Sequence, residues 1–193
     1  MIYMYKLICI SNRALCSGDF IERIRGILDL GIPVILREKD LSETEYYDLL
    51  LKIGRKEIIV HTFVGAAQEF GCRAIHLPLP VLETADISGF DTVGASTHSV
   101  AEARRAETLG ASYITAGHIF QTDCKKDLAP RGLGLLTEIK NTVSIPVYAL
   151  GGISPDNASA AIAAGADGAA VMSGFMKCED SREYCVKYKH ILV

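Results

Sequence analysis

Residues 146–174 read PVYALGGISPDNASAAIAAGADGAAVMSG and predict one complete strand–helix–strand unit. A short apolar strand at 146–150 runs into a Gly-Gly turn, an alanine-rich helix follows at 155–164, and a second strand covers 168–172. Short apolar runs alternate in this way with segments of helical period along the whole chain. That alternation is typical of repeated βα units around a parallel sheet.

Eight such units fit in 193 residues, so we expect a (β/α)8 TIM barrel with short helices, formed by one domain over residues 1–193. The strands are expected at 5–10, 33–37, 57–61, 74–77, 92–94, 112–116, 146–150 and 168–172. The helices are expected at 19–30, 43–54, 64–70, 99–109, 133–141, 155–164 and 180–190, with an irregular link at 78–90 because Pro78 and Pro80 disfavour a helix. A doubly wound open sheet is the competing architecture, but SNRAL at 11–15 lacks its glycine-rich fingerprint.

The composition excludes several classes of protein. The formal net charge is -3 and no long run of Lys and Arg occurs, which argues against nucleic-acid binding. The 6 cysteines are scattered without a C-x-x-C pair, so we expect reduced thiols and no zinc site. The opening MIYMYKLICI is too short for a signal peptide, and no later apolar run reaches the roughly 18 residues that a membrane span needs. We therefore expect a cytoplasmic protein that binds neither nucleic acid nor membrane.

Two loops near the end of the chain predict a phosphate site. A Gly-Gly pair follows the seventh expected strand, and Ser154 and Pro155 then match an N-cap and a first helical residue. In TIM barrels the loops after strands 7 and 8 form the recurrent phosphate site. Plain turn chemistry is the alternative for either loop alone. The expected phosphate-binding residues are Gly151, Gly152, Met172, Ser173 and Gly174.

His118 is predicted to be the catalytic residue. It lies in AGHIFQTDCKK at 116–126, where an apolar strand ends and a polar, cationic loop begins. The carboxyl ends of barrel strands carry the chemistry, and histidine is suited to give and take a proton near neutrality. The alternative is a structural histidine hydrogen-bonded beneath a loop. Cys124 is interpreted as an incidental thiol, since Lys125 alone would favour its thiolate.

Two further segments offer ligand contacts. Arg37 and Lys39 alternate after the second expected strand and so point to the same side, unless they form a solvated surface cluster with the acids Glu38 and Asp40. After the fifth expected strand, the loop at 95–99 contains the candidate contact residues Ser96 and His98. Its last residue, Ser99, has an alternative role as the cap of the helix that follows.

Taken together, these loops resemble the thiamin phosphate synthase superfamily of TIM barrels over nearly the whole chain. The segments that carry the resemblance are REK at 37–39, GASTHS at 94–99, GHIFQTDCK at 117–125, GGISP at 151–155 and AAGADG at 163–168. In the synthase branch, a proline stands at the place of His118, a glutamine lies in strand 2, and an Asn-Asp pair and a Gly-Gln-x-Asp stretch hold magnesium and diphosphate. This sequence has Ile35, His61-Thr62 and LPLP at 77–80 at those places.

The run GHIFQTDCKK at 117–126 instead resembles the TenI-type thiazole tautomerase branch. That resemblance implies a reaction that converts the thiazole tautomer released by thiazole synthase into the aromatic carboxythiazole phosphate. A proton moves between ring and exocyclic carbons, with no metal or redox cofactor. His118 would move the proton, while Arg37 and Lys39 would hold the ring carboxylate or stabilise developing charge. The expected substrate-binding residues are Arg37, Lys39, Ser96, His98, Thr122 and Lys125.

Two alternatives to the tautomerase stay open. The chain would be a thiamin phosphate synthase, a transferase that joins a pyrimidine diphosphate to a thiazole phosphate, or a non-catalytic regulatory protein that binds the thiazole phosphate. The expected partner is a small phosphorylated thiazole, and no cofactor is expected. The sequence leaves the oligomeric state open and is compatible with a homo-oligomer.

Overall fold

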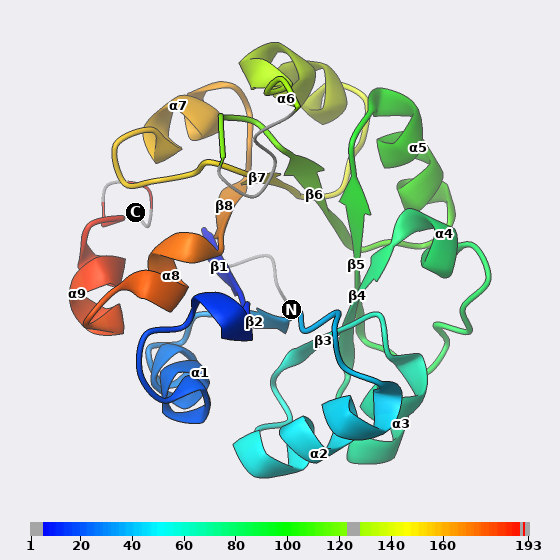
Figure 1. Cartoon of the computed structure of the whole chain (residues 1–193). Helices are drawn as coiled ribbons and strands as arrows, with labels where there is room; N and C mark the ends of the chain where they lie inside the picture. The colour runs from blue at the N-terminus through cyan, green and yellow to red at the C-terminus, as the bar shows by residue number, and fades with distance from the viewer. Residues whose placement is uncertain (1–5, 123–127, 190, 192–193) are drawn as a thin grey trace.

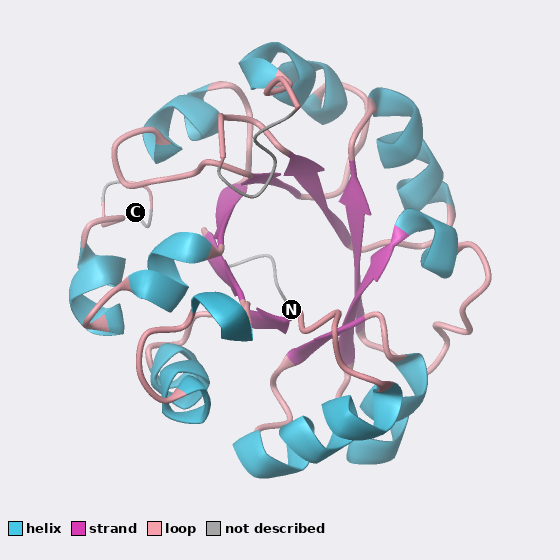
Figure 2. Cartoon of the chain, viewed as in Figure 1, coloured by secondary structure: helices cyan, strands magenta, loops and turns pink. Residues whose placement is uncertain are grey.

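The computed structural model describes residues 6–122, 128–189 and 191. Eight parallel strands close into a barrel in the order β1 to β8, with helices around the outside (Figures 1 and 2). The strands are β1 (Leu7–Ile10), β2 (Val34–Leu36), β3 (Ile59–His61), β4 (Ala74–Pro78), β5 (Thr92–Thr97), β6 (Tyr113–Gly117), β7 (Val147–Leu150) and β8 (Gly168–Val171). Since β1 pairs with both β2 and β8, the predicted (β/α)8 barrel is confirmed and an open doubly wound sheet is excluded.

The strands form where the sequence predicts them, and β5 differs most from its expected length. It continues to Thr97 instead of ending at Gly94. The added segment is fully paired, because Ser96 lies opposite Pro78 of β4 and Thr115 of β6. Pairing on both sides outweighs the loop-like composition of this stretch. Ser96 is therefore held on a strand rather than on the expected loop.

The helices follow the strands in alternation. They are α1 (Phe20–Asp29), α2 (Glu43–Ile53), α3 (Val64–Phe70), α4 (Leu79–Leu82), α5 (Val100–Thr108), α6 (Gly132–Lys140), α7 (Ala158–Ala163), α8 (Ser173–Lys177) and α9 (Ser181–Val186), with the 3-10 helix η1 (Arg13–Leu15) after β1. The α2 helix shows why the sequence predicts most of them. Ser42 and Glu45 form a reciprocal capping box at its start, and Gly54 ends it with a φ of 68°.

The structure corrects three of the expected helix boundaries. The helix expected at 180–190 is α9, which ends at Val186 because the N–H groups that follow donate to carbonyls three residues back. The link at 78–90 contains the single turn α4, because Pro80 lies in the first turn, where its missing N–H is not needed. The α7 helix begins at Ala158 rather than at 155, and Ser154 is not its N-cap. Instead, Asn157 accepts a hydrogen bond from the Ser154 N–H and donates one to the Gly152 carbonyl, both at 2.8 Å. The side chain of Asn157 thus ties the turn that precedes α7.

The buried hydrophobic residues form two clusters, and the smaller one lies inside the barrel. The rings of Tyr113 and Tyr148 meet there edge to face, with centroids 5.6 Å apart. Since these side chains fill the barrel interior, ligands must bind at one of its two mouths. The buried residues of the cluster are Ile8, Ile10, Ile35, Ile59, Tyr113, Tyr148 and Ala170.

The structure also bears on the expectations about membranes and thiols. Within the described residues, no helix is both long and apolar enough to cross a bilayer. The cysteines that the structure describes are all free. Burial raises the pKa of Cys9, and it raises the pKa of Cys72 to about 11. Both thiols are therefore poor nucleophiles, and Cys124 lies outside the described residues.

Candidate active site

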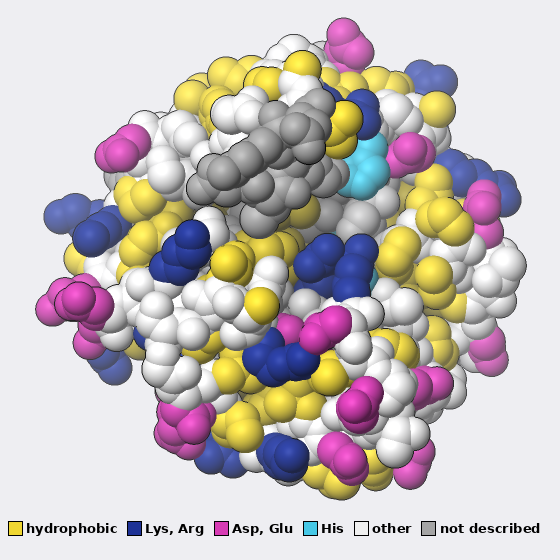
Figure 3. Space-filling model, in the orientation of Figure 1, with side chains coloured by type: hydrophobic (Ala, Val, Ile, Leu, Met, Phe, Trp, Pro, Cys, Tyr) yellow, Lys and Arg dark blue, Asp and Glu magenta, His cyan; other side chains and the backbone are white. Residues whose placement is uncertain are grey.

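A cavity of about 420 Å³ opens at the carboxyl ends of the strands, where Ile10 ends β1, His61 ends β3 and Leu150 ends β7. Figure 3 shows Lys and Arg side chains near the centre of this face. Lys125 lies outside the described residues, and Gly174 is not among the described residues that line the cavity. The other predicted site residues all line it: Arg37, Lys39, Ser96, His98, His118, Thr122, Gly151, Gly152, Met172 and Ser173.

The two glycines after β7 pack against the segment that carries His118. Gly151 and Gly152 have φ values of 94° and 65°, a region that glycine adopts readily. A Cβ on Gly151 would collide with the Cβ of His118, and one on Gly152 would collide with the Gln121 carbonyl oxygen. The Phe120 N–H also donates to the Gly151 carbonyl at 3.0 Å. These glycines therefore fix the loop after β6, whatever ligand they contact.

The residues after β8 have two different surroundings. Met172 and Ser173 line the cavity, and the Asn12 amide lies 3.9 Å from the Met172 sulfur. A Cβ on Gly174 would instead collide with the phenol of Tyr184 in α9. The glycine there allows α9 to pack on α8, a role that the phosphate prediction did not include. Asn12 also lines the cavity, and the sequence signal for it is its place in the polar segment that begins at Ser11, after β1 ends.

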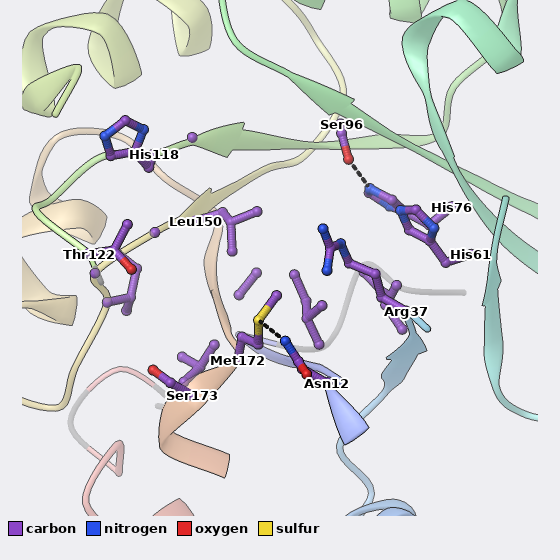
Figure 4. A pocket seen from close by; sticks show the side chains of 18 of the residues that line it. Asn12, Arg37, His61, His76, Ser96, His118, Thr122, Leu150, Met172 and Ser173 are labelled. Atoms are coloured by element: carbon purple, nitrogen blue, oxygen red, sulfur yellow. Dashed lines mark hydrogen bonds between the residues drawn. The ribbon is translucent and has the colours of Figure 1, made fainter. Parts of the chain in front are cut away.

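The imidazole of His118 is buried, and the structure accounts for only one of its two ring nitrogens. Nε2 lies 3.3 Å from the Leu128 carbonyl oxygen, whereas Nδ1 is buried without a hydrogen-bond partner among the described residues. A carbonyl oxygen only accepts, so Nε2 is the donor of this bond, and in the neutral ring Nδ1 keeps a lone pair. Figure 4 shows His118 across the cavity from Arg37.

Arg37 and Lys39 reach the cavity from the segment after β2. Glu38 between them points the other way and is only 3% exposed. It accepts hydrogen bonds from the Ser11 hydroxyl at 2.6 Å and from the Arg13 N–H at 2.9 Å. Burial raises the pKa of Glu38, although the Ser11 bond opposes that shift. The alternative of a solvated cluster is therefore wrong for Glu38, which anchors the segment to the loop after β1.

His98 and Ser99 take the separate roles that the sequence left open. The Ser99 hydroxyl accepts from the Glu102 N–H at 3.2 Å and caps α5, as the capping alternative predicts. His98 lines the cavity, and its Nδ1 lies 2.6 Å from the Gly117 carbonyl oxygen. That carbonyl belongs to the residue directly before His118. The His98 side chain therefore stabilises the end of β6.

Two histidines of the cavity wall were not predicted as site residues. His61 and His76 lie opposite each other in the β3–β4 register, and their rings stack with centroids 5.9 Å apart. Burial lowers the pKa of His61 to about 2 and that of His76 to about 3, and the charge of Arg37 adds to both shifts. Both rings are therefore neutral near pH 7. The available signal is that each histidine follows two apolar residues near the end of consecutive strands.

The positions that hold magnesium in the synthase branch carry other chemistry here. His61 and Pro78, which come from these positions, stand on the cavity wall, as does Ile35 at the place of the glutamine, and the described residues that line the cavity include no Asp or Glu. Nδ1 of His61 is 2.7 Å from the Thr62 hydroxyl. Nowhere in the described ranges do three or more His, Cys, Asp or Glu side chains gather as metal ligands would. Magnesium prefers carboxylate oxygens, so the described residues do not fit a magnesium diphosphate site.

Comparisons with known proteins agree with the fold and the superfamily resemblance. Residues 7–175 match the protein family described as thiamine monophosphate synthase. A thiamine-phosphate synthase of Clostridium acetobutylicum is 31% identical over 191 residues, which cover 93% of this chain and 90% of that protein. One from Desulfitobacterium hafniense is 36% identical and covers 91% of both chains. The solved thiamine phosphate pyrophosphorylase from Pyrococcus furiosus has a TM-score of 0.80 at 31% identity, covering 98% of this chain and 96% of that one.

Proposed function

Because the chain belongs to the thiamine monophosphate synthase family, we propose that it acts on a phosphorylated thiazole and catalyses the tautomerase reaction. In this reaction a proton leaves a ring carbon and a proton is returned to the exocyclic carbon, so that the ring becomes aromatic. The net change is a shift of one hydrogen. The reaction needs one group that can accept and then donate a proton.

The observation that carries the proposal is the state of His118. Its Nδ1 has no partner among the described residues, while its Nε2 is engaged by the Leu128 carbonyl. Buried nitrogens without a partner are rare in proteins, and His118 is also a residue of the cavity wall, so it is a candidate for chemistry. A lone pair on Nδ1 can take the proton from the ring carbon, and the imidazolium can return it. The Leu128 carbonyl accepts the hydrogen bond from Nε2–H during both proton transfers.

The remaining cavity residues are proposed to hold the substrate by its two acidic groups. The backbone N–H groups of Gly151, Gly152 and Ser173 would bind the phosphate between β7 and β8. Arg37, which lies across the cavity from Ser173 in Figure 4, and Lys39, which also lines the cavity, would bind the ring carboxylate. Fixing both ends of the substrate would keep the ring between these anchors, within reach of His118. Thr122 and Lys125 are proposed to contact the same substrate.

Thiamine-phosphate synthase activity is the second candidate, and the names of the relatives favour it. That transferase reaction displaces diphosphate, which needs a cation with oxygen ligands to offset its charge. The described cavity residues do not supply such ligands, and this supports the tautomerase. A non-catalytic thiazole phosphate-binding protein is the third candidate, and it shares every binding residue with the tautomerase.

One pair of assays separates the three candidates. The purified chain is given the thiazole tautomer from a thiazole synthase reaction, and the aromatic product is followed by chromatography. In parallel it is given a pyrimidine diphosphate and thiazole phosphate with magnesium. The tautomerase aromatises the first substrate and forms no thiamin phosphate in the second. Formation of thiamin phosphate would establish the transferase, and product binding without turnover in either assay would establish the binding protein.

A further inference from the structure

A line of hydrogen bonds leads from the barrel interior to the cavity wall. The phenol oxygen of Tyr113 lies 3.0 Å from Nδ1 of His76, and Nε2 of His76 lies 2.9 Å from the Ser96 hydroxyl. Tyr113 is 1% exposed and does not line the cavity, whereas His76, which is 2% exposed, and Ser96 both lie on its wall. Figure 4 shows the Ser96 hydroxyl directed at the ring of His76. The hydroxyl is thus connected to a phenol that no ligand can reach.

The hydrogen bond between Tyr113 and His76 passes over β5, and the absence of a side chain at Gly94 leaves space for it. His76 of β4 and Tyr113 of β6 both lie opposite Gly94 of β5 in the barrel register. A Cβ on Gly94 would collide with the Tyr113 phenol and with Nδ1 of His76. Gly94 has no positive φ that would require a glycine for its backbone. Its small size therefore serves the contact between the two rings.

The burial of Tyr113 determines which atom carries each proton. Among the described residues, the phenol oxygen has one hydrogen-bond partner, Nδ1 of His76. If Nδ1 carried the imidazole proton, the phenol hydrogen would be buried without an acceptor, which is unfavourable. The phenol therefore donates to Nδ1. Since His76 is neutral, its proton is then on Nε2 and is donated to Ser96.

We propose that Ser96 donates a hydrogen bond to an acceptor atom in the ring of the ligand, and that Tyr113 and His76 are positioning residues that fix this polarity. Because the Ser96 oxygen accepts from His76, its own proton is available to a ligand in the cavity. The identity of the ligand rests on the proposed function. In a phosphorylated thiazole whose carboxylate and phosphate are held elsewhere, the ring nitrogen is the acceptor that remains.

The first test compares carboxythiazole phosphate with its thiophene analogue, which lacks the ring nitrogen. Isothermal titration is expected to show that the parent protein binds the thiophene about 10-fold more weakly, as for the loss of one hydrogen bond. In Ser96→Ala and in Tyr113→Phe, the ratio of the two dissociation constants should fall toward one. Tyr188→Phe is the matched control, since it removes a buried phenol that pairs with Tyr184 and leaves the cavity unchanged. It should keep the discrimination of the parent protein.

The second test determines which ring nitrogen of His76 carries the proton, by nitrogen NMR of protein labelled at histidine. The signals of His76 are assigned by their loss in His76→Gln. The expected spectrum has a protonated Nε2 and an unprotonated Nδ1, and Tyr113→Phe should show a mixture of tautomers. A protonated Nδ1 in the parent protein would overturn the inference, as would equal binding of the two ring compounds. If neither compound binds, the proposed function fails as well, and this outcome differs from equal binding.

Discussion

Two substitutions of His118 separate a catalytic imidazole from a structural one. The amide nitrogen of glutamine can occupy the place of Nε2 and keep the bond to the Leu128 carbonyl, which is 3.3 Å long in the parent protein. Asparagine is too short to keep it. Neither side chain can accept and return a proton near neutrality. If the imidazole is catalytic, His118→Gln and His118→Asn should both be inactive, whereas a structural role would leave His118→Gln nearly normal.

The expected size of the effect follows from the role of this residue in both proton transfers. General acid–base catalysis by one group contributes about 10²–10⁴-fold, and a group that serves both steps belongs near the upper end. The turnover number should therefore fall by about 10⁴-fold, or about 5 kcal/mol in activation free energy. His118→Asn loses the single hydrogen bond to the Leu128 carbonyl, which should cost about 1 kcal/mol in the free energy of unfolding.

The assay combines single-turnover aromatisation of the tautomer with titration of the stable product. Since the imidazole acts in the transition state, both variants should bind carboxythiazole phosphate within about threefold of the parent affinity while losing turnover. Urea unfolding checks that each variant is folded. The reasoning is refuted if His118→Gln keeps most of the parent rate, because the Nδ1 lone pair then has no part in the reaction.

Three further predictions concern the loops, the metal and the pH dependence of stability. Gly152→Ala should reduce turnover and product affinity each by about 10-fold, because the added Cβ displaces the loop after β6. Gly31→Ala is the control, since Gly31 also has a positive φ, of 75°, but open space around it. This control should cost only about 1 kcal/mol of stability. Tautomerase turnover should be unchanged by a chelator, and a rate that returns only with added magnesium would point to oxygen ligands outside the described residues. Stability to urea should fall as pH drops below 6.5, since the unfolded chain takes up protons on His61 and His76 that the folded chain accepts only near pH 2 to 3. Each histidine should contribute about 1.4 kcal/mol per pH unit in that window, so an unchanged slope in His76→Gln would contradict this account.

The barrel could be predicted because its signals are local. Each strand is a short apolar run, and α1, α2 and α5 each begin with a side-chain cap, as Ser42 shows for α2. The one-turn helices α4 and α8 could not be predicted, since segments of four or five residues carry too little periodic signal. The boundary of α7 depends on Asn157, whose side chain bonds backbone groups that many turn sequences would equally offer. Turn chemistry of this kind is visible only once the chain path is known.

The candidate site divides in the same way. Arg37, Lys39 and His118 could be proposed from sequence because they follow strands, and a parallel barrel gathers all strand ends at one mouth. The reason for each glycine was harder to predict. Gly152 matches a phosphate loop, yet its Cβ position faces the Gln121 carbonyl, and Gly174 faces Tyr184. Both contacts join different structural elements, so no pattern within one element predicts them.

The placement of His61 and His76 on the cavity wall could not be predicted, because it depends on the register between neighbouring strands. His61, His76, Gly94 and Tyr113 lie in one row across β3, β4, β5 and β6, because each is paired with the next in the parallel register. A shift of one residue in any strand would turn its side chain to the opposite face of the sheet. Within this row, Gly94 decides whether the rings on either side of it can touch. A chain that kept both His76 and Tyr113 but carried a side chain at position 94 would lose their hydrogen bond, and with it the polarity of the Ser96 hydroxyl.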